Sequence, residues 1–264
     1  MPYLNVNNIN LYYELHGQGA PVLFIHGLGS STRDWEYQTP YFSKDWLLLF
    51  FDLRGHGKSD KPDHPYTIKQ FCSDTAQLIE ALFPEGVHVL GHSLGGMVAF
   101  QLAVDHPKLV KTLTILNSAP AAVLPSFKAR FLFFLRFFDV RLFGMEHVSK
   151  QLGNMLFPNP EQVSLRETFI QRWNENDPKA YTNALKAFRG WSVMHRINTI
   201  KCPTLIITAD NDYTPAPFKE FYTRLIPNAK LVVIKNSRHI TNIDQADLFN
   251  KTVGDFLKKS ENSP

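Results

Sequence analysis

Short apolar runs alternate with stretches of helical periodicity along most of the chain. Runs typical of strands cover residues 4–6, 11–15, 22–26, 47–51, 87–91, 112–116, 204–208 and 231–234. The first two flank Asn7-Asn8, a pair that favours a two-residue hairpin turn because asparagine tolerates positive φ. The other six are almost continuously apolar, which is typical of strands buried on both faces of a parallel sheet.

Helical periodicity fills intervals between these runs, at residues 68–82, 94–105, 218–225 and 245–258. The alternation predicts an α/β fold: a mostly parallel eight-stranded sheet with helices on both faces. Residues 121–196 break the alternation, because helix-like segments punctuated by prolines replace the strands there. A structureless loop of that length is uncommon in a compact domain. We therefore expect a helical cap at 121–196, inserted between two strands of a core formed by 1–120 and 197–264.

Composition narrows the class of protein. The 264 residues are 44% hydrophobic and 20% charged, as in average soluble domains. The net charge of +4 comes from basic residues spread along the chain, which argues against nucleic-acid binding. Two cysteines, Cys72 and Cys202, are interpreted as small core residues. No signal-peptide pattern and no apolar run of about 18 residues is present. We expect a cytoplasmic monomer or dimer without stable membrane insertion.

The strongest chemical motif is Gly91-His92-Ser93-Leu94-Gly95, which lies between a predicted strand and a predicted helix. A sharp turn between these elements strains its central residue, and the flanking glycines avoid side-chain collisions. The turn raises the Ser93 hydroxyl at the carboxyl end of the sheet, next to a helix N-terminus that favours an oxyanion. Ser93 is therefore the candidate nucleophile.

A serine nucleophile needs a base and an acid that orients the base. Of the ten histidines, His239 alone follows a predicted strand by a short loop and precedes the final helix. The acid is expected after a strand between Ser93 and His239, where the sequence offers Asp210 and Asp212. One of this pair is expected only to shape the turn.

Two backbone amides are candidates for an oxyanion hole. The amide of Leu94 follows Ser93 directly, and Leu28 lies in the glycine-rich turn His26-Gly-Leu-Gly29 after a buried strand. No metal-ligand spacing and no phosphate-binding glycine loop is found in the sequence. We expect neither a metal nor a cofactor.

Taken together, these motifs resemble the α/β-hydrolase superfamily, over essentially the whole chain outside the cap. The motifs are His26-Gly-Leu-Gly29, Asp52-Leu-Arg-Gly-His-Gly-Lys-Ser59, Gly91-His-Ser-Leu-Gly-Gly96, Asp212 and Ser237-Arg-His239. The family pattern of its acid aligns with Ala209-Asp-Asn-Asp212-Tyr-Thr-Pro215, which favours Asp212, although Ala209 replaces the usual glycine. The resemblance implies a structural role for the segment that begins at Asp52. It is strongest to carboxylesterases and enol-lactonases of the family.

The segment from Phe127 to Phe143 is unusually rich in phenylalanine. On a helix, its residues Phe127, Phe131, Phe134 and Phe138 would form one stripe. Such a stripe is most often core packing. A second interpretation is an apolar roof over Ser93, with Phe134 and Phe138 binding substrate. A third is contact with lipid through the interspersed basic residues Lys128, Arg130, Arg136 and Arg141.

The hypothesis from the sequence is a cofactor-independent serine esterase of small to medium apolar acyl or aromatic substrates. Ser93, His239 and Asp212 form the expected triad, and the amides of Leu28 and Leu94 the expected oxyanion hole. A lactonase or a C–C-bond hydrolase with the same triad remains an alternative. A ligand receptor that retains the fold but turns over almost nothing is another.

Overall fold

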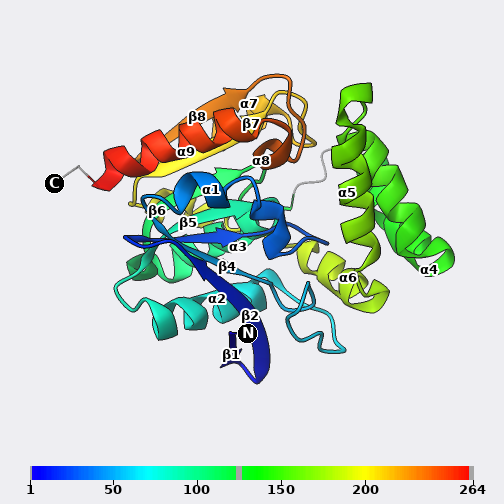
Figure 1. The fold of residues 1–264 in the computed structure, drawn as a ribbon, viewed down its shortest axis with the longest axis horizontal. Coiled ribbons are helices and arrows are strands. Elements are labelled where there is room, and N and C mark those ends of the chain that lie inside the picture. Colours follow the sequence, from blue (N-terminus) through cyan, green and yellow to red (C-terminus); the bar gives the residue numbers. More distant parts are fainter. Residues whose placement is uncertain (1, 123–126, 262–264) are drawn as a thin grey trace.

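A computed structural model describes residues 2–122 and 127–261, and a single eight-stranded sheet runs through it (Figure 1). In space, the strands follow the order β1-β2-β4-β3-β5-β6-β7-β8. β2 pairs antiparallel with both β1 and β4, whereas all other neighbours are parallel. The predicted mostly parallel sheet is thereby confirmed. The strands are β1 (Tyr3–Val6), β2 (Ile9–His16), β3 (Pro21–Ile25), β4 (Leu47–Phe51), β5 (Val87–His92), β6 (Val110–Leu116), β7 (Thr204–Ala209) and β8 (Ala229–Ile234).

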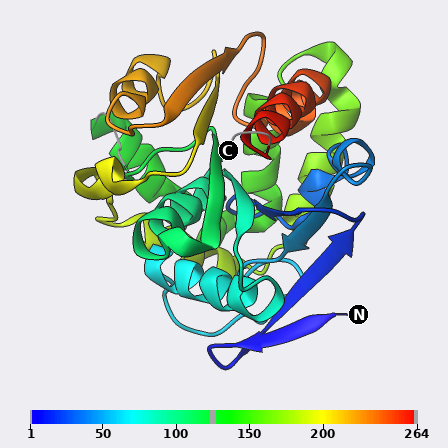
Figure 2. The same ribbon diagram turned by 90° about the vertical axis from the view of Figure 1, so that its left-hand side faces the viewer.

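The antiparallel edge of the sheet is a tight hairpin of β1 and β2. Its turn consists of Asn7 and Asn8, whose φ angles are 48° and 60°, and Val6 pairs with Ile9 across it. Positive φ at both central residues gives the turn a twist that matches that of the strands. Figure 2 shows the hairpin at the margin of the sheet.

Helices cover both faces of the sheet (Figure 2) because successive side chains of its strands point to opposite sides. On β3, Leu23 and Ile25 belong to the core on one face, whereas Val22 and Phe24 belong to the core on the other. The first core is covered by α2 (Ile68–Leu82), α3 (Leu94–Asp105) and α7 (Ala216–Thr223). The second is covered by α1 (Thr39–Phe42) and α9 (Ala246–Glu261).

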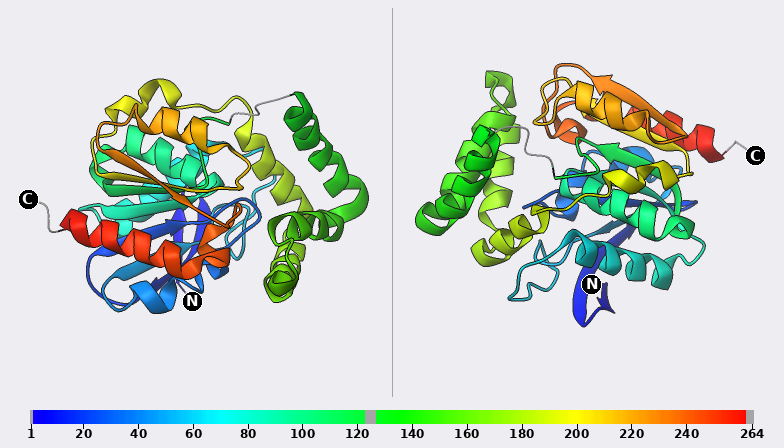
Figure 3. Two further views of the ribbon diagram at one scale, coloured as in Figure 1. Left: turned by 90° about the horizontal axis from the view of Figure 1, so that it is seen from above. Right: turned by 180° about the vertical axis from the view of Figure 1, so that it is seen from behind.

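Three helices between β6 and β7 stand together beyond one end of the sheet (Figures 1 and 3). They are α4 (Phe127–Leu156), α5 (Val163–Asn174) and α6 (Pro178–Leu185), called the cap helices below. Gly144, with φ of 74°, breaks α4 into two helical parts. The cap helices share a separate apolar cluster that includes Trp173 and Tyr181. Where the insertion joins the sheet, Ala121 and Ser192 form an antiparallel bridge.

Several element boundaries differ from the prediction by a few residues. α7 begins at Ala216, two residues before the predicted start, because a proline in the first turn of a helix loses no hydrogen bond. β8 begins at Ala229, also two residues early. A short helix, α8 (Thr241–Asp244), precedes α9.

The two cysteines are unpaired, as expected for core residues. Cys72 is buried and Cys202 is partly buried. Among the described residues, no helix is both long enough and apolar enough to cross a membrane.

Candidate active site

Ser93 lies in a strained turn between β5 and α3. Its φ of 53° and ψ of −113° lie outside the regions that L-residues ordinarily occupy. Close packing of the backbone explains the glycines around it. A Cβ atom at Gly91 would overlap the carbonyl oxygen of Gly95, and one at Gly95 would overlap that of Ile25. The sequence Gly-x-Ser-x-Gly therefore permits a turn in which the serine hydroxyl projects from the sheet.

A chain of hydrogen bonds joins Ser93, His239 and Asp212, which are far apart in the sequence. The Nε2 atom of His239 lies 2.8 Å from the Ser93 hydroxyl oxygen. Its Nδ1 atom lies 2.5 Å from Oδ1 of Asp212. An Nδ1–H that donates to the carboxylate leaves Nε2 free to accept the serine proton. The His239 side chain keeps 14% of its exposure, whereas Asp212 is fully buried.

A buried lysine shares the Asp212 carboxylate with His239. Lys219, on α7, contacts Oδ2 of Asp212 and donates to the hydroxyl of Thr208 at 2.7 Å. Both members of this ion pair are fully buried. Burial alone would raise the pKa of Asp212, but His239 and Lys219 outweigh it and hold that pKa below its usual range. Asp212 is therefore a carboxylate at neutral pH.

Asp210, the other candidate acid, has a different contact set. It accepts hydrogen bonds from the backbone amides of Asn236 at 3.0 Å and Ser237 at 3.1 Å. These residues belong to the loop that carries His239. Asp210 thus fixes this loop, and Asp212 contacts the imidazole itself.

Two further side chains hold the His239 backbone. His92 Nε2 donates to the His239 carbonyl oxygen at 2.8 Å, and burial lowers the pKa of His92 to about 3. Asn117, at the end of β6, donates to the same oxygen at 2.8 Å. Its own side-chain oxygen accepts the amide of Ala209, the last residue of β7, at 2.8 Å. Asn117 therefore couples the end of β7, shortly before Asp212, to the loop that carries His239.

The two predicted oxyanion donors belong to the start of α3 and to the loop after β3. Leu94 is the first residue of α3, where backbone N–H groups have no partner within the helix. Leu28 lines the cavity at Ser93. Its loop is held by His26, which donates from Nδ1 to the Gly27 carbonyl oxygen at 2.7 Å and accepts the Leu53 amide at 3.0 Å.

The Asp52 segment contacts loops around the site and not the cavity. Asp52 accepts the backbone amides of Thr32 at 2.7 Å and Lys58 at 2.8 Å. Arg54 forms a buried two-point ion pair with Asp74 of α2, at 2.5 and 2.6 Å. These contacts agree with the structural role that the resemblance implied.

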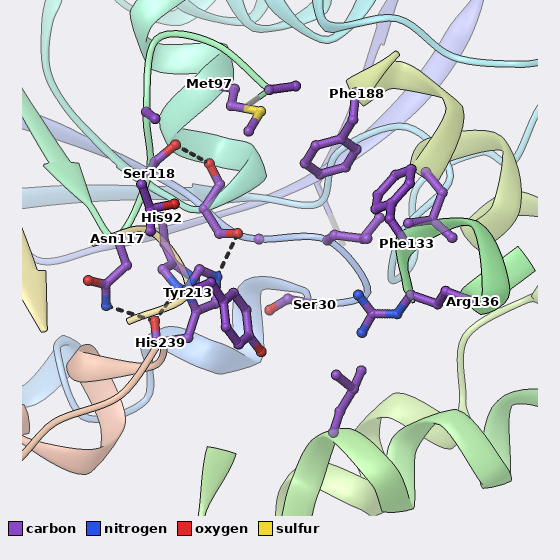
Figure 4. Close-up of a pocket in the computed structure, with 18 of the residues that line it drawn as sticks. Ser30, His92, Met97, Asn117, Ser118, Phe133, Arg136, Phe188, Tyr213 and His239 are labelled. Carbon is purple, nitrogen blue, oxygen red and sulfur yellow. Dashed lines mark hydrogen bonds between the residues drawn. The ribbon is translucent and has the colours of Figure 1, made fainter. Parts of the chain in front are cut away.

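A cavity of about 1260 Å³ opens at Ser93 and His239. His92 and Asn117, at the ends of β5 and β6, lie on one side of the cavity, and Phe133 and Arg136 of α4 lie on the other (Figure 4). Tyr213 lies against the His239 imidazole, with ring centroids 4.2 Å apart and an angle of 27° between the rings. Among the described residues, no cluster of histidine, cysteine and acidic side chains could hold a metal ion.

The cap contributes aromatic side chains to the cavity, and one of them, Phe138, belongs to the stripe expected from the sequence. Phe138 lines the cavity and keeps 45% of its exposure. The side chains of Phe127, Phe131 and Phe134 lie outside the part of the structure that is described. The cavity is also lined by two rings one helical turn apart on α4, Phe133 and Phe137, whose centroids are 5.8 Å apart.

Several residues of the site were missed in the sequence: Lys219, Asn117, Tyr213, Phe133 and Phe137. Nothing in the sequence distinguishes Lys219 or Asn117 from surface or turn residues. The sequence does give one indication for Tyr213, because this residue directly follows Asp212, the candidate acid. Phe133 and Phe137 are four residues apart, but phenylalanines fill so much of this helix that the spacing selects no face.

Comparison with known proteins places the chain in a family. The family model of the α/β-hydrolase fold matches residues 20–246. The chain therefore belongs to the α/β-hydrolase family, which confirms the resemblance found in the motifs.

Individual relatives are similar over almost their whole length. The chain is 28% identical to the (E)-2-((N-methylformamido)methylene)succinate hydrolase of Acinetobacter baylyi, covering 96% of this chain and 95% of that protein. It is 25% identical to a pimeloyl-acyl-carrier-protein methyl ester esterase of Legionella pneumophila, covering 95% and 100%. The crystal structure of the enol-lactonase from Burkholderia xenovorans superposes with a TM-score of 0.89 at 28% identity, covering 97% and 100%. Esterases and enol-lactonases are the branch that the motifs resembled.

Proposed function

We propose that the protein hydrolyses carboxylic esters through an acyl-enzyme formed on Ser93. The observation that carries the proposal is the hydrogen-bonded chain from Ser93 through His239 to Asp212, with separations of 2.8 and 2.5 Å. A serine is a useful nucleophile only when a base takes its proton, and this chain supplies both a base and an acid that orients it. Ser93 and His239 line a cavity that is large enough for a substrate.

In the proposed reaction, the Ser93 oxygen attacks the ester carbonyl carbon while His239 Nε2 takes the hydroxyl proton. The amides of Leu28 and Leu94 donate to the oxyanion of the tetrahedral intermediate. His239 then gives its proton to the leaving alcohol as the carbon–oxygen bond breaks. Water attacks the acyl-enzyme with His239 again as the base, and the acid leaves as Ser93 regains its proton.

Asp212 remains ionised throughout the proposed cycle. Its carboxylate holds His239 in the tautomer with the proton on Nδ1 and stabilises the imidazolium. Lys219 supports this state because a buried cation at Oδ2 keeps the carboxylate charged.

Lactones are a second substrate class for the same chemistry. A lactone is a cyclic ester, so its ring opens by the same attack and the alcohol stays attached to the acyl group. The similarity in structure to an enol-lactonase, at 28% identity over 97% of this chain, favours this candidate.

Turnover measurements on matched serine variants test the proposal. The substrates are p-nitrophenyl esters of increasing acyl length, with a γ-lactone in parallel. Ser93→Ala should reduce kcat by at least about 10⁴-fold, because it removes the oxygen that forms the acyl-enzyme. Ser73→Ala, on the partly exposed face of α2, is the control and should retain the wild-type rate. Turnover by Ser93→Ala at the wild-type rate would contradict the proposal.

A further inference from the structure

Arg136 has no part in the proposed ester chemistry although it lies in the cavity. Arg136, on α4, lines the cavity, and its side chain is partly buried. Figure 4 shows its guanidinium group pointing into the cavity, toward Ser30, on the opposite side from His239. An arginine directed into a ligand cavity needs an explanation, since the other side chains that approach it are mainly apolar.

Aromatic rings from two other cap helices hold this guanidinium group. Its central carbon lies 5.9 Å from the ring centroid of Trp173, on α5, and 5.9 Å from that of Tyr181, on α6. Both rings are buried, at 8% and 1% exposure. A guanidinium group against aromatic faces is favourably placed, and its planar N–H groups remain able to donate at their edge.

Arg136 forms no ion pair with any carboxylate among the described residues. Among the described residues that line the cavity, basic side chains outnumber acidic ones. Asp34 is the one acid, and the basic residues are Arg136, Arg141, Lys186 and Arg189. The Asp34 carboxylate has other partners than Arg136, because it accepts a hydrogen bond from Ser30 and interacts with Arg33 and Arg172. The cavity therefore has an excess of positive charge, concentrated on the side of the cap.

We propose that this cavity selects esters that carry a carboxylate, and that Arg136 binds this carboxylate while the ester group lies at Ser93. The proposal rests on the proposed function and names its substrate class. Arginine matches the two oxygens of a carboxylate with two parallel N–H groups, and a partly dehydrated site strengthens such bonds. The carboxylate takes no part in the bond changes at the ester.

Three esters of related size test the proposal. Methyl hexanoate is neutral, monomethyl adipate carries a carboxylate at the far end of its acyl part, and carboxymethyl hexanoate carries one on its alcohol part. We expect the wild-type protein to show a higher kcat/KM for at least one anionic ester than for methyl hexanoate. The ester that is preferred identifies which side of the scissile bond faces Arg136.

Substitution of Arg136 then locates the effect. Arg136→Gln should lower kcat/KM for the preferred anionic ester by about tenfold to hundredfold, as expected for a lost hydrogen bond to a charged group. It should leave methyl hexanoate within about threefold, because glutamine retains most of the apolar stem. Arg136→Lys keeps the charge and should retain part of the preference. Lys150→Gln, an exposed charge on the same helix outside the cavity, is the matched control and should change nothing.

A binding measurement separates this inference from the proposed function. Calorimetry with the Ser93→Ala variant should detect binding of at least one of the two anionic esters, and this binding should weaken at least tenfold when Arg136→Gln is added. If the wild-type protein hydrolyses none of the esters, the proposed function fails, while this binding difference still supports the anionic subsite. Hydrolysis of all three with equal kcat/KM, unchanged in Arg136→Gln, would overturn the inference and leave the proposed function standing.

Discussion

The two walls of the cavity are held in different ways. On the sheet side, the His239 imidazole contacts both Ser93 and Asp212, and its carbonyl oxygen receives hydrogen bonds from His92 and Asn117. On the cap side, Phe133 meets Phe137 and Phe188 through ring contacts at 5.8 and 5.9 Å. Hydrogen bonds fix direction, whereas apolar contacts are non-directional and tolerate substitution.

The difference suggests a division between chemistry and selectivity. Groups that transfer protons must stay within hydrogen-bond distance, so they are expected on strand ends and on loops fixed by several bonds. Groups that only surround a substrate can vary with little effect on the reacting atoms. Substitutions on the sheet side should therefore change kcat for every substrate, and substitutions on the cap side should change the ratio between substrates.

The largest expected change in kcat distinguishes Asp212 from Asp210. Asp212→Asn should lower kcat by up to about 10⁴-fold, because the amide no longer holds the His239 tautomer that accepts the serine proton. Asp210→Asn should stay within about tenfold of wild type on that scale, since Asp210 accepts hydrogen bonds from backbone amides of the His239 loop and from the Asn211 side chain, and not from the imidazole. Steady-state kinetics on one p-nitrophenyl ester decides between them. The reverse ranking would assign the orienting acid to Asp210.

The next effect concerns stability and its dependence on pH. Lys219→Met leaves the buried Asp212 carboxylate without its lysine, which should reduce the free energy of unfolding at pH 7 by about 3–5 kcal/mol. In the wild-type protein, the lowered pKa of Asp212 stabilises the fold at pH values above about 3.9, the ordinary pKa of aspartate. This stabilisation is lost as the pH falls through the lower pKa that Asp212 has in the folded state.

Without Lys219, one of the two groups that lower the pKa of Asp212 is missing, so this pKa rises relative to wild type while His239 still contacts the carboxylate. The difference in unfolding free energy between wild type and Lys219→Met should therefore narrow as pH falls through the pKa that Asp212 has in the variant. Urea unfolding at a series of pH values measures this difference. Thr208→Val, which removes only the hydroxyl bonded to Lys219, is the control and should cost about 1 kcal/mol. A gap that stays constant with pH would show that Lys219 acts through packing alone.

The smallest effect is expected on the cap side. Phe137→Ala should shift the ratio of kcat/KM between short and long acyl esters by tens-fold at most, because each methylene in an apolar pocket contributes about 1–3 kcal/mol. Leu142→Ala, at a position of α4 where the residue is 67% exposed, should leave the ratio unchanged. A uniform loss of rate on all esters, together with a lower Tm, would indicate that Phe137 is core packing.

The sheet side of the site was largely predictable from the sequence, for physical reasons. Apolar runs buried on both faces mark the strands, and a glycine-flanked serine marks a turn that few other sequences permit. The strand that ends at Ala209 places Asp210 and Asp212 beside the loop of His239, but spacing alone left both open as the acid. Their different partners became visible only in three dimensions.

The remaining features depend on tertiary contacts that leave no local pattern. Lysine is almost never fully buried unless it is paired, so the position of Lys219 beside Asp212 has no counterpart in its neighbouring sequence. On α4, phenylalanines surround much of the helix, and the periodicity therefore does not select the face that lines the cavity. Gly144, which breaks this helix with a φ of 74°, changes the direction of the chain as well.

Covalent labelling of Ser93 tests the central claim most directly. A fluorophosphonate reacts with a serine only when a neighbouring base activates it, and peptide mass spectrometry then locates the adduct. We predict a single adduct on Ser93 in the wild-type protein, slower labelling in Asp212→Asn and labelling at the wild-type rate in Asp210→Asn. An adduct on another residue, or labelling that persists in Ser93→Ala, would contradict the account.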